Sequence, residues 1–161
     1  MSSPALGRRL ALTLAMAVAG VGMALGQQLP PAPARWVLDS SGFLSPSART
    51  TLDGGLEAFE KRQGTQVVVA IFPRLPPGEV LEDWTAKVAE SWKVGRARQD
   101  DGVVLFLFVD DRALRIEVGR GLEGALTDLE ASRIINGLLV PRLRAGDRDG
   151  AVLGAAQAMQ L

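Results

Sequence analysis

The stretch that most limits the fold is the apolar run GVVLFLFV, residues 102–109, which contains no polar or charged side chain. A strand that is apolar along its whole length belongs in the middle of a sheet with both faces covered. The next segment, ALRIEV, alternates instead, which is typical of a strand with one buried face and with Arg115 and Glu117 facing solvent. We therefore predict an antiparallel hairpin with Asp110 and Asp111 as a two-residue turn.

The chain before this hairpin predicts a helix, a strand and a second helix. The first helix begins at Ser45, a good N-cap in front of Pro46, and ends at Gly64. Residues 65–72, TQVVVAIF, predict a buried strand that Pro73 stops. The second helix has apolar residues at helical spacing along one face: Leu81, Trp84, Val88 and Trp92.

The chain after the hairpin predicts two more helices. Thr127 followed by Glu130 is the signature of a capping box, which opens a helix. Pro141 is expected to end or kink that helix, because proline lacks the backbone N–H of the helical hydrogen bond. An alanine-rich last helix covers roughly residues 148–160.

This order of elements predicts a layered α/β/α domain with a small mixed sheet. Strands 65–72 and 102–109 are joined through a helix, so we expect a parallel pair with a right-handed crossover. The hairpin adds an antiparallel strand, and helices flank the sheet.

Residues 1–26 predict an export signal. Two arginines precede an apolar run over 10–25, which ends in the small-x-small pattern Ala-Leu-Gly of a signal peptidase site. We therefore expect a periplasmic or secreted protein that begins at or near Gln27, with no membrane span after cleavage. An uncleaved N-terminal anchor is the alternative, because the run is near the lower length limit for a span.

The proline- and alanine-rich residues 27–35 predict an extended tether, and residues 36–161 the folded domain. Cleavage of the signal removes two arginines and no acid, which leaves 16 basic and 18 acidic residues. That nearly neutral balance argues against nucleic acid and anionic membranes as partners.

The chain contains no cysteine and no histidine. Thiolate and imidazole ligands are therefore missing, and neither zinc nor haem is expected. Oxygen ligands remain, and these suit Ca²⁺ or Mg²⁺. The segment GRGLEG lacks both the strand-then-helix setting of a dinucleotide fingerprint and the lysine of a P-loop, so no flavin or nucleotide is expected.

Four segments together resemble the TPM domain family, named after thylakoid-lumen, photosystem-repair and receptor-modulating proteins. They are VLDSSGFLS, GTQVVVAIF, DDGVVLFLFVDDRALRIEVGRGLEGALTD and VPRLRAGDRDGAV, and the resemblance covers about residues 37–160. It implies an exported protein, with acid phosphatase activity or calcium binding as activities known in the family. Arg120 stands where members usually have an aromatic residue, and Asp101 where asparagine is common.

The acidic residues fall into two groups, because an extended strand of eight residues separates its ends by roughly 26 Å. Our first choice for a metal site is the group near the start of strand 102–109, where the hairpin returns. It comprises Asp100, Asp101, Glu123 and Asp128. Glycine-rich backbone and a helix N-terminus lie beside it and favour an anion, with four candidate residues: Gly119, Arg120, Gly121 and Thr127.

The second choice for a metal site is Asp39 with Asp110 and Asp111, at the carboxyl ends of the strands, where ligands of α/β proteins commonly bind. Each acid also has an ordinary structural interpretation. Aspartates at 110 and 111 suit a turn, and Asp128 suits the first turn of a helix.

Two functions are compatible with these residues. The first is an exported, divalent-cation-binding module that assists assembly or repair of an envelope protein complex. The alternative is a metal-assisted acid phosphatase in which the ion polarises a phosphoryl oxygen and a carboxylate orients water. The missing histidine and the lack of a recognisable nucleophile motif favour the binding module, and the catalytic residues stay open.

Overall fold

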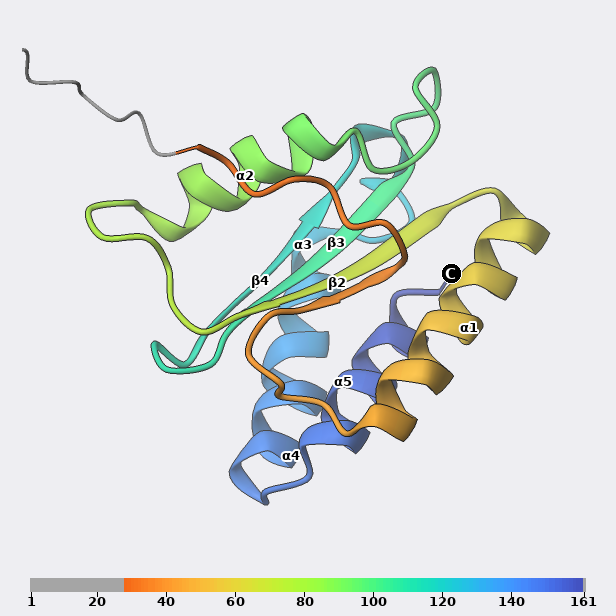
Figure 1. Ribbon diagram of the computed structural model, residues 1–161. Helices are drawn as coiled ribbons and strands as arrows, with labels where there is room; N and C mark the ends of the chain where they lie inside the picture. Colours follow the sequence, from red (N-terminus) through yellow and green to blue (C-terminus); the bar gives the residue numbers. More distant parts are fainter. Residues whose placement is uncertain (1–27, 161) are drawn as a thin grey trace, which may run out of the picture.

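A mixed sheet of four strands forms the centre of the domain in the computed structural model, which describes residues 28–160 (Figure 1). The strands lie in the order β1 (Val37–Asp39), β2 (Gln66–Phe72), β3 (Gly102–Phe108) and β4 (Ala113–Val118). The first three are parallel, and β4 is antiparallel to β3. The other elements are α1 (Pro46–Gln63), α2 (Leu81–Trp92), the 3₁₀ turn η1 (Arg120–Leu122), α3 (Asp128–Arg133), the π-helical segment η2 (Ile134–Leu139), α4 (Val140–Arg144) and α5 (Arg148–Ala158).

Helices cover both faces of this sheet. All seven residues of β3 are buried, as the continuous apolar run predicts. Alternate side chains of β3 point to opposite faces, so Leu105 belongs to the core under α1 and α5, and Phe106 to the core under α2. Trp84 and Trp92 of α2 lie in that second core. Figure 1 shows α2 on one side of the sheet and α1, α4 and α5 on the other, which confirms the layered α/β/α fold.

The ends of α1 follow the sequence signals. The Ser45 hydroxyl accepts a hydrogen bond from the Ala48 amide at 3.2 Å, and Pro46 is in the first turn. Gly64 ends the helix with φ 80°, a left-handed conformation that glycine adopts without steric cost. Asp149, at the start of α5, accepts from the Ser45 hydroxyl at 2.6 Å, so the beginnings of α1 and α5 are tied together.

The hairpin has the predicted register but a longer turn. Val103 pairs with Val118, and the Gly119 amide donates to the Gly102 carbonyl at 2.8 Å. The loop, however, covers the four residues 109–112. The amides of residues 109 and 110 donate to the carbonyls of residues 72 and 73. The chain after β3 therefore follows the end of β2 and no longer pairs with β4.

The first strand, β1, is not predicted from the sequence. β1 has only three residues and pairs in parallel with β2, with Val37 opposite Val69. Three residues are too few to show the alternation by which a strand is recognised. Its position was decided by the neighbouring strand.

Pro141 does not end the third helix. The chain continues from α3 through η2 into α4, and Pro141 is in the first turn of α4. In the π-helical η2, a backbone amide donates to the carbonyl five residues earlier instead of four, as the Val140 amide does to the Ile135 carbonyl. This widening lets the helix pass the missing N–H of proline without a break.

The described part of the predicted tether, residues 28–35, packs against the folded domain. Leu29 packs against the core under α2, and the Trp92 indole N–H donates to the Pro30 carbonyl at 2.7 Å. Arg35 forms ion pairs with Asp53 and Glu57 of α1. The export signal and its cleavage site lie outside the described residues, and within those residues no helix is long and apolar enough to cross a membrane.

Candidate functional site

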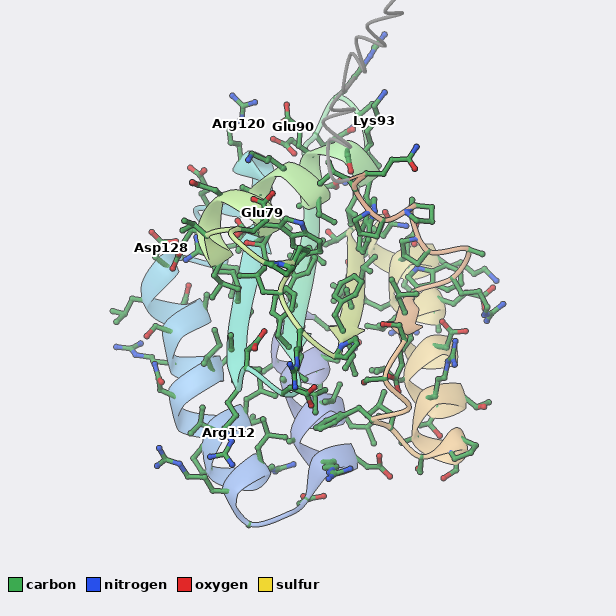
Figure 2. All side chains as sticks on the ribbon, turned by 60° about the vertical axis from the view of Figure 1, so that its left-hand side comes forward. Glu79, Glu90, Lys93, Arg112, Arg120 and Asp128 are labelled. Atoms are coloured by element: carbon green, nitrogen blue, oxygen red, sulfur yellow. The ribbon has the colours of Figure 1, made fainter. Side chains whose placement is uncertain are left out.

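The two predicted acid groups lie at opposite ends of the sheet. Figure 2 shows Arg120, Glu90 and Lys93 at one end of the domain and Arg112 at the other. Seven residues of β3 separate these ends by about 23 Å. The two groups therefore cannot share one ligand.

Asp101, in the first-choice group, is buried and engaged by one arginine. Its carboxylate accepts from the Arg96 amide and from Nε of the same residue, both at 2.7 Å, and also from Nη2. Burial by itself raises the pKa of Asp101, but these hydrogen bonds and the charge of Arg96 hold the pKa below its ordinary value. Asp101 thus fixes the loop that leads into β3.

The other three acids of that group are exposed. Asp100 pairs with Arg120 at 3.3 Å. Glu123 follows η1 and Asp128 begins α3. Among residues 28–160, no three acidic side chains lie close enough together to hold a metal ion, so the predicted cation site stays a prediction.

The glycines proposed to cradle an anion have a packing role. A Cβ on Gly119 would lie 2.2 Å from the Asp100 carbonyl oxygen, and one on Gly121 would lie 1.9 Å from the Gln99 carbonyl oxygen. Only glycine permits this close approach of two backbones. Thr127 is used too, since it forms the predicted capping box with Glu130. Arg120 is the one candidate of this set with a charged side chain, and that side chain pairs with Asp100.

In the second-choice group, Asp39 organises the loop between β1 and α1. Its carboxylate accepts hydrogen bonds from the amides of Ser41, Phe43 and Leu44 at 2.9–3.1 Å and from the Ser41 hydroxyl. Burial alone raises the pKa of Asp39, and the four hydrogen bonds together bring it below its ordinary value. The aspartate holds Phe43 in place.

Asp110 and Asp111 fasten the hairpin loop to the segment after β2. Asp110 pairs with Nε of Arg74 at 2.9 Å, and Asp111 accepts from the Leu75 amide at 2.7 Å. The loop then ends at Arg112, whose φ of 52° turns the chain back into β4. These acids therefore anchor the loop that carries Arg112.

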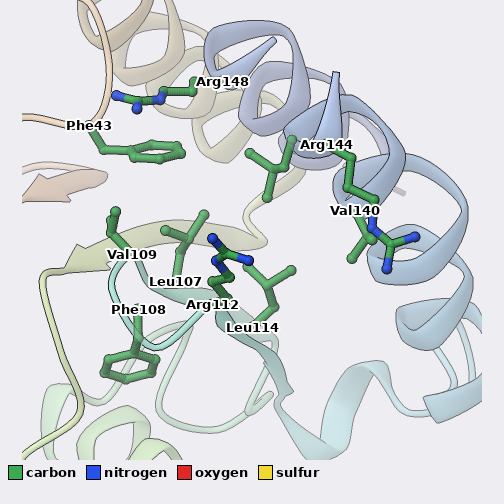
Figure 3. Close-up of a pocket in the computed structure, with 10 residues that line it drawn as sticks. Phe43, Leu107, Phe108, Val109, Arg112, Leu114, Val140, Arg144 and Arg148 are labelled. Carbon is green, nitrogen blue, oxygen red and sulfur yellow. The ribbon is translucent and has the colours of Figure 1, made fainter. Parts of the chain in front are cut away.

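A pocket of about 680 Å³ opens beside these loops, at the carboxyl ends of the parallel strands (Figure 3). Ligands of α/β proteins commonly bind at such ends. Its floor is mostly apolar and is built from the loop after β1, the end of β3, the start of β4 and α4, through Phe43, Leu107, Val109, Leu114, Val140 and Leu143.

Three arginines lie around this floor: Arg112 as the last residue of the hairpin loop, Arg144 at the end of α4 and Arg148 at the start of α5. None of them forms an ion pair with a carboxylate of residues 28–160. The Arg148 guanidinium lies 5.2 Å from the ring centre of Phe43, within the range of a cation–π contact. The pocket thus combines an apolar floor with an unneutralised cationic rim.

Sequence reasoning did not identify these residues as a site. Arg144 and Arg148 belong to the arginine-rich segment RLRAGDRDG, which only the resemblance had singled out. They are far from Arg112 in the chain, and the packing of α4 and α5 against the sheet brings them to the same opening.

Arg115 and Glu117 are less exposed than the strand pattern predicts, with side chains 40% and 17% exposed. They pair at 2.9 Å, and the buried Thr85 hydroxyl of α2 donates to Glu117 at 2.7 Å. The alternation in β4 is right, but α2 covers the face that it assigns to solvent. These polar groups dock α2 on β4.

The fold is that of a layered α/β domain with a candidate anion pocket. A family profile described as the TPM domain matches residues 37–160, and the chain belongs to this family. No curated protein compared with the chain matches it.

Three solved structures are similar to this chain. The N-terminal domain of a protein from P. gingivalis is 34% identical, with a TM-score of 0.71 over 78% of this chain and 80% of that one. An N-terminal domain from Corynebacterium glutamicum is 19% identical, with a TM-score of 0.61 over 81% of each chain. A protein of Bizionia argentinensis is 14% identical, with a TM-score of 0.63 over 76% of this chain and 82% of that one. The last two show the fold alone.

Proposed function

We propose that this TPM domain is a binding module that holds an anionic group of a partner in the pocket between Arg112, Arg144 and Arg148. The observation that carries the proposal is the set of three arginines without carboxylate partners among the described residues, arranged around one apolar opening. Guanidinium groups bind carboxylates and phosphates through paired hydrogen bonds. An anion bound there would face three arginine charges that no carboxylate of the described residues neutralises.

The predicted setting of this module is the cell envelope. The export signal of the sequence supports a periplasmic or secreted location, and a binding role agrees with assistance in assembly or repair of an envelope complex. A divalent cation would then be structural. The alternative, a metal-assisted phosphatase, would need carboxylates free to bind an ion, whereas Asp101, Asp39, Asp110 and Asp111 all hold backbone or arginine groups.

Inorganic phosphate and acetate test the proposal. We would record ¹H–¹⁵N NMR spectra of the protein beginning at Gln27 while each anion replaces chloride at constant ionic strength. The proposal predicts saturable shifts of the amide signals of Phe43, Arg112, Arg144 and Arg148. The shifts should be lost in the double variant Arg112→Gln/Arg144→Gln and retained in Arg62→Gln, which removes an exposed charge near the end of α1.

Shifts that do not saturate, or that persist in the double variant, would overturn the pocket as the anion site. A parallel titration with calcium chloride tests the predicted cation. Shifts at Asp100, Asp101, Glu123 and Asp128 would support the first acid group, and shifts at the Asp39 loop would support the second. A spectrum unchanged by calcium would remove the cation from the proposal.

A further inference from the structure

Building on this proposed function, we infer that the pocket takes an acidic peptide segment in which one large apolar side chain is flanked by carboxylates. The pocket has two chemically distinct parts, a cationic rim and an apolar floor. The arginines of the rim select a ligand whose negative charges are spaced apart. The floor selects a ligand with an apolar group between those charges.

The rim charges are separated from one another. Arg112, Arg144 and Arg148 come from three different segments, and Figure 3 shows their guanidinium groups apart from one another, with Arg112 near Leu107, Arg148 beside Phe43 and Arg144 beside Val140. A single phosphate or sulfate presents its charge at one point and leaves part of this rim unmatched. Carboxylates carried at intervals along an extended chain match a spaced rim, and interfaces bring such opposite potentials together.

The floor requires an apolar group on the same ligand. Phe43, Leu114 and Leu143 line it and are partly exposed, and a fully hydrated anion would leave this surface in contact with water. A Phe or Leu side chain inserted between the arginines removes that surface from water, and this is the usual form of an anchor residue in an interface. The volume of about 680 Å³ accommodates one such anchor with its flanking backbone.

The walls of the pocket are fixed in advance by side chains that the ligand does not contact. Asp39 holds the loop that carries Phe43, and Asp110 and Asp111 hold the loop that ends at Arg112. A preformed site loses little conformational entropy on binding. The acidic residues of the second-choice group are thus positioning residues for an anion site.

Three short peptides with blocked ends test the inference by isothermal titration calorimetry on the protein beginning at Gln27. The first, Glu-Asp-Phe-Glu-Asp, has both the charges and the anchor. The second, Glu-Asp-Ala-Glu-Asp, keeps the charges without the anchor, and the third, Gln-Asn-Phe-Gln-Asn, keeps the anchor without the charges. We expect the first to bind at least about tenfold more tightly than either of the others.

Variants place the binding in the pocket. Arg112→Gln/Arg144→Gln should weaken the first peptide at least about tenfold, whereas the matched variant Arg62→Gln should leave its affinity unchanged. Leu143→Gln, which makes the floor polar and keeps the rim, should weaken the first peptide and leave the second as it was. Circular dichroism and the melting temperature of each variant show whether it is folded, and an unfolded Leu143→Gln is replaced by Val140→Thr in the same comparison.

The outcomes separate this inference from the proposed function. If phosphate and acetate bind in the pocket but the three peptides bind equally, or none binds, the peptide inference is wrong and the anion site stands. If neither anions nor peptides bind, both fail. Binding to vesicles of anionic phospholipid, measured by co-sedimentation, with no preference for the first peptide, would replace the peptide by a lipid headgroup.

Discussion

Asp100 and Asp101 are adjacent in the chain and have different environments. Asp101 is 4% exposed and accepts three hydrogen bonds from Arg96. Asp100 is exposed, has φ 48°, and makes a surface pair with Arg120. Aspartate and asparagine both tolerate this left-handed backbone. At position 101 the negative charge of aspartate is therefore what stabilises the structure. At position 100 the requirement is a residue that tolerates the left-handed backbone.

Replacement of Asp101 by asparagine tests this difference. Asp101→Asn should lower the free energy of unfolding by about 2 kcal/mol at pH 7, because hydrogen bonds to a charged group are lost and Arg96 keeps its charge. Asp100→Asn is the control and should change it by less than about 0.5 kcal/mol, since exposed ion pairs contribute little. Urea unfolding followed by tryptophan fluorescence measures both.

The same pair of proteins gives a pH dependence. The pKa of Asp101 is lowered in the folded state, so its contribution to stability is complete above the pKa of the unfolded chain. It is lost as the pH falls through the lower, folded-state pKa. The difference in unfolding free energy between wild type and Asp101→Asn should therefore shrink from pH 7 toward pH 3, and a difference that stays constant would show that charge is not the cause.

At the scale of elements, the glycines around η1 serve backbone packing, although their pattern resembles an anion-binding loop. Gly119 and Gly121 bring this turn against the backbone of residues 99–100, and the Gly121 amide donates to the Asp100 carbonyl at 3.0 Å. The turn thereby ties the return of the hairpin to the loop that enters β3. The pattern that suggests a phosphate cradle is here required by backbone packing.

Alanine substitutions distinguish packing from flexibility as the reason for these glycines. Gly121→Ala would place a Cβ 1.9 Å from the Gln99 carbonyl oxygen and should destabilise the domain by about 1–3 kcal/mol, the usual cost of overpacking. Gly124→Ala meets nothing within 4 Å and should cost less than about 0.5 kcal/mol. Equal melting temperatures for the two variants would contradict the packing role.

At the scale of the whole molecule, the sheet has a core on each face, and the segment before β1 reaches both sides. Leu29 and Pro30 contact the α2 side, whereas Arg35 and the Trp36 amide contact Asp53 of α1. A segment predicted as a spacer thus closes the edge of the domain.

Shortening the chain tests this closure. A protein that begins at Arg35 should be less stable by about 1–2 kcal/mol than one that begins at Gln27, because it loses partial burial of Leu29 and the bond from Trp92. Trp92→Phe removes the indole donor, so the same shortening should cost less in that background. Equal urea midpoints for the two lengths would show that the segment adds nothing.

Much of the fold could be predicted because local signals and burial pointed the same way. Ser45 with Pro46, the box of Thr127 with Glu130, and the unbroken run 102–109 each act over a few residues. The length of the hairpin turn and the passage of the helix through Pro141 could not be predicted. Both depend on hydrogen bonds to segments or geometries that the local sequence does not contain.

Capping signals and periodicity are properties of neighbouring residues, so the sequence was enough to predict the main helices, the strands over 65–72, 102–109 and 113–118, the register of the hairpin and the separation of two polar ends, though not β1. The tertiary structure was needed to show which groups the side chains at each end contact. The aspartates were visible in the sequence, but their hydrogen-bond partners were not. The three arginines of the pocket come together only because α4 and α5 pack on the sheet beside the hairpin. A site built from distant segments exists only once long-range packing has brought its residues to one place.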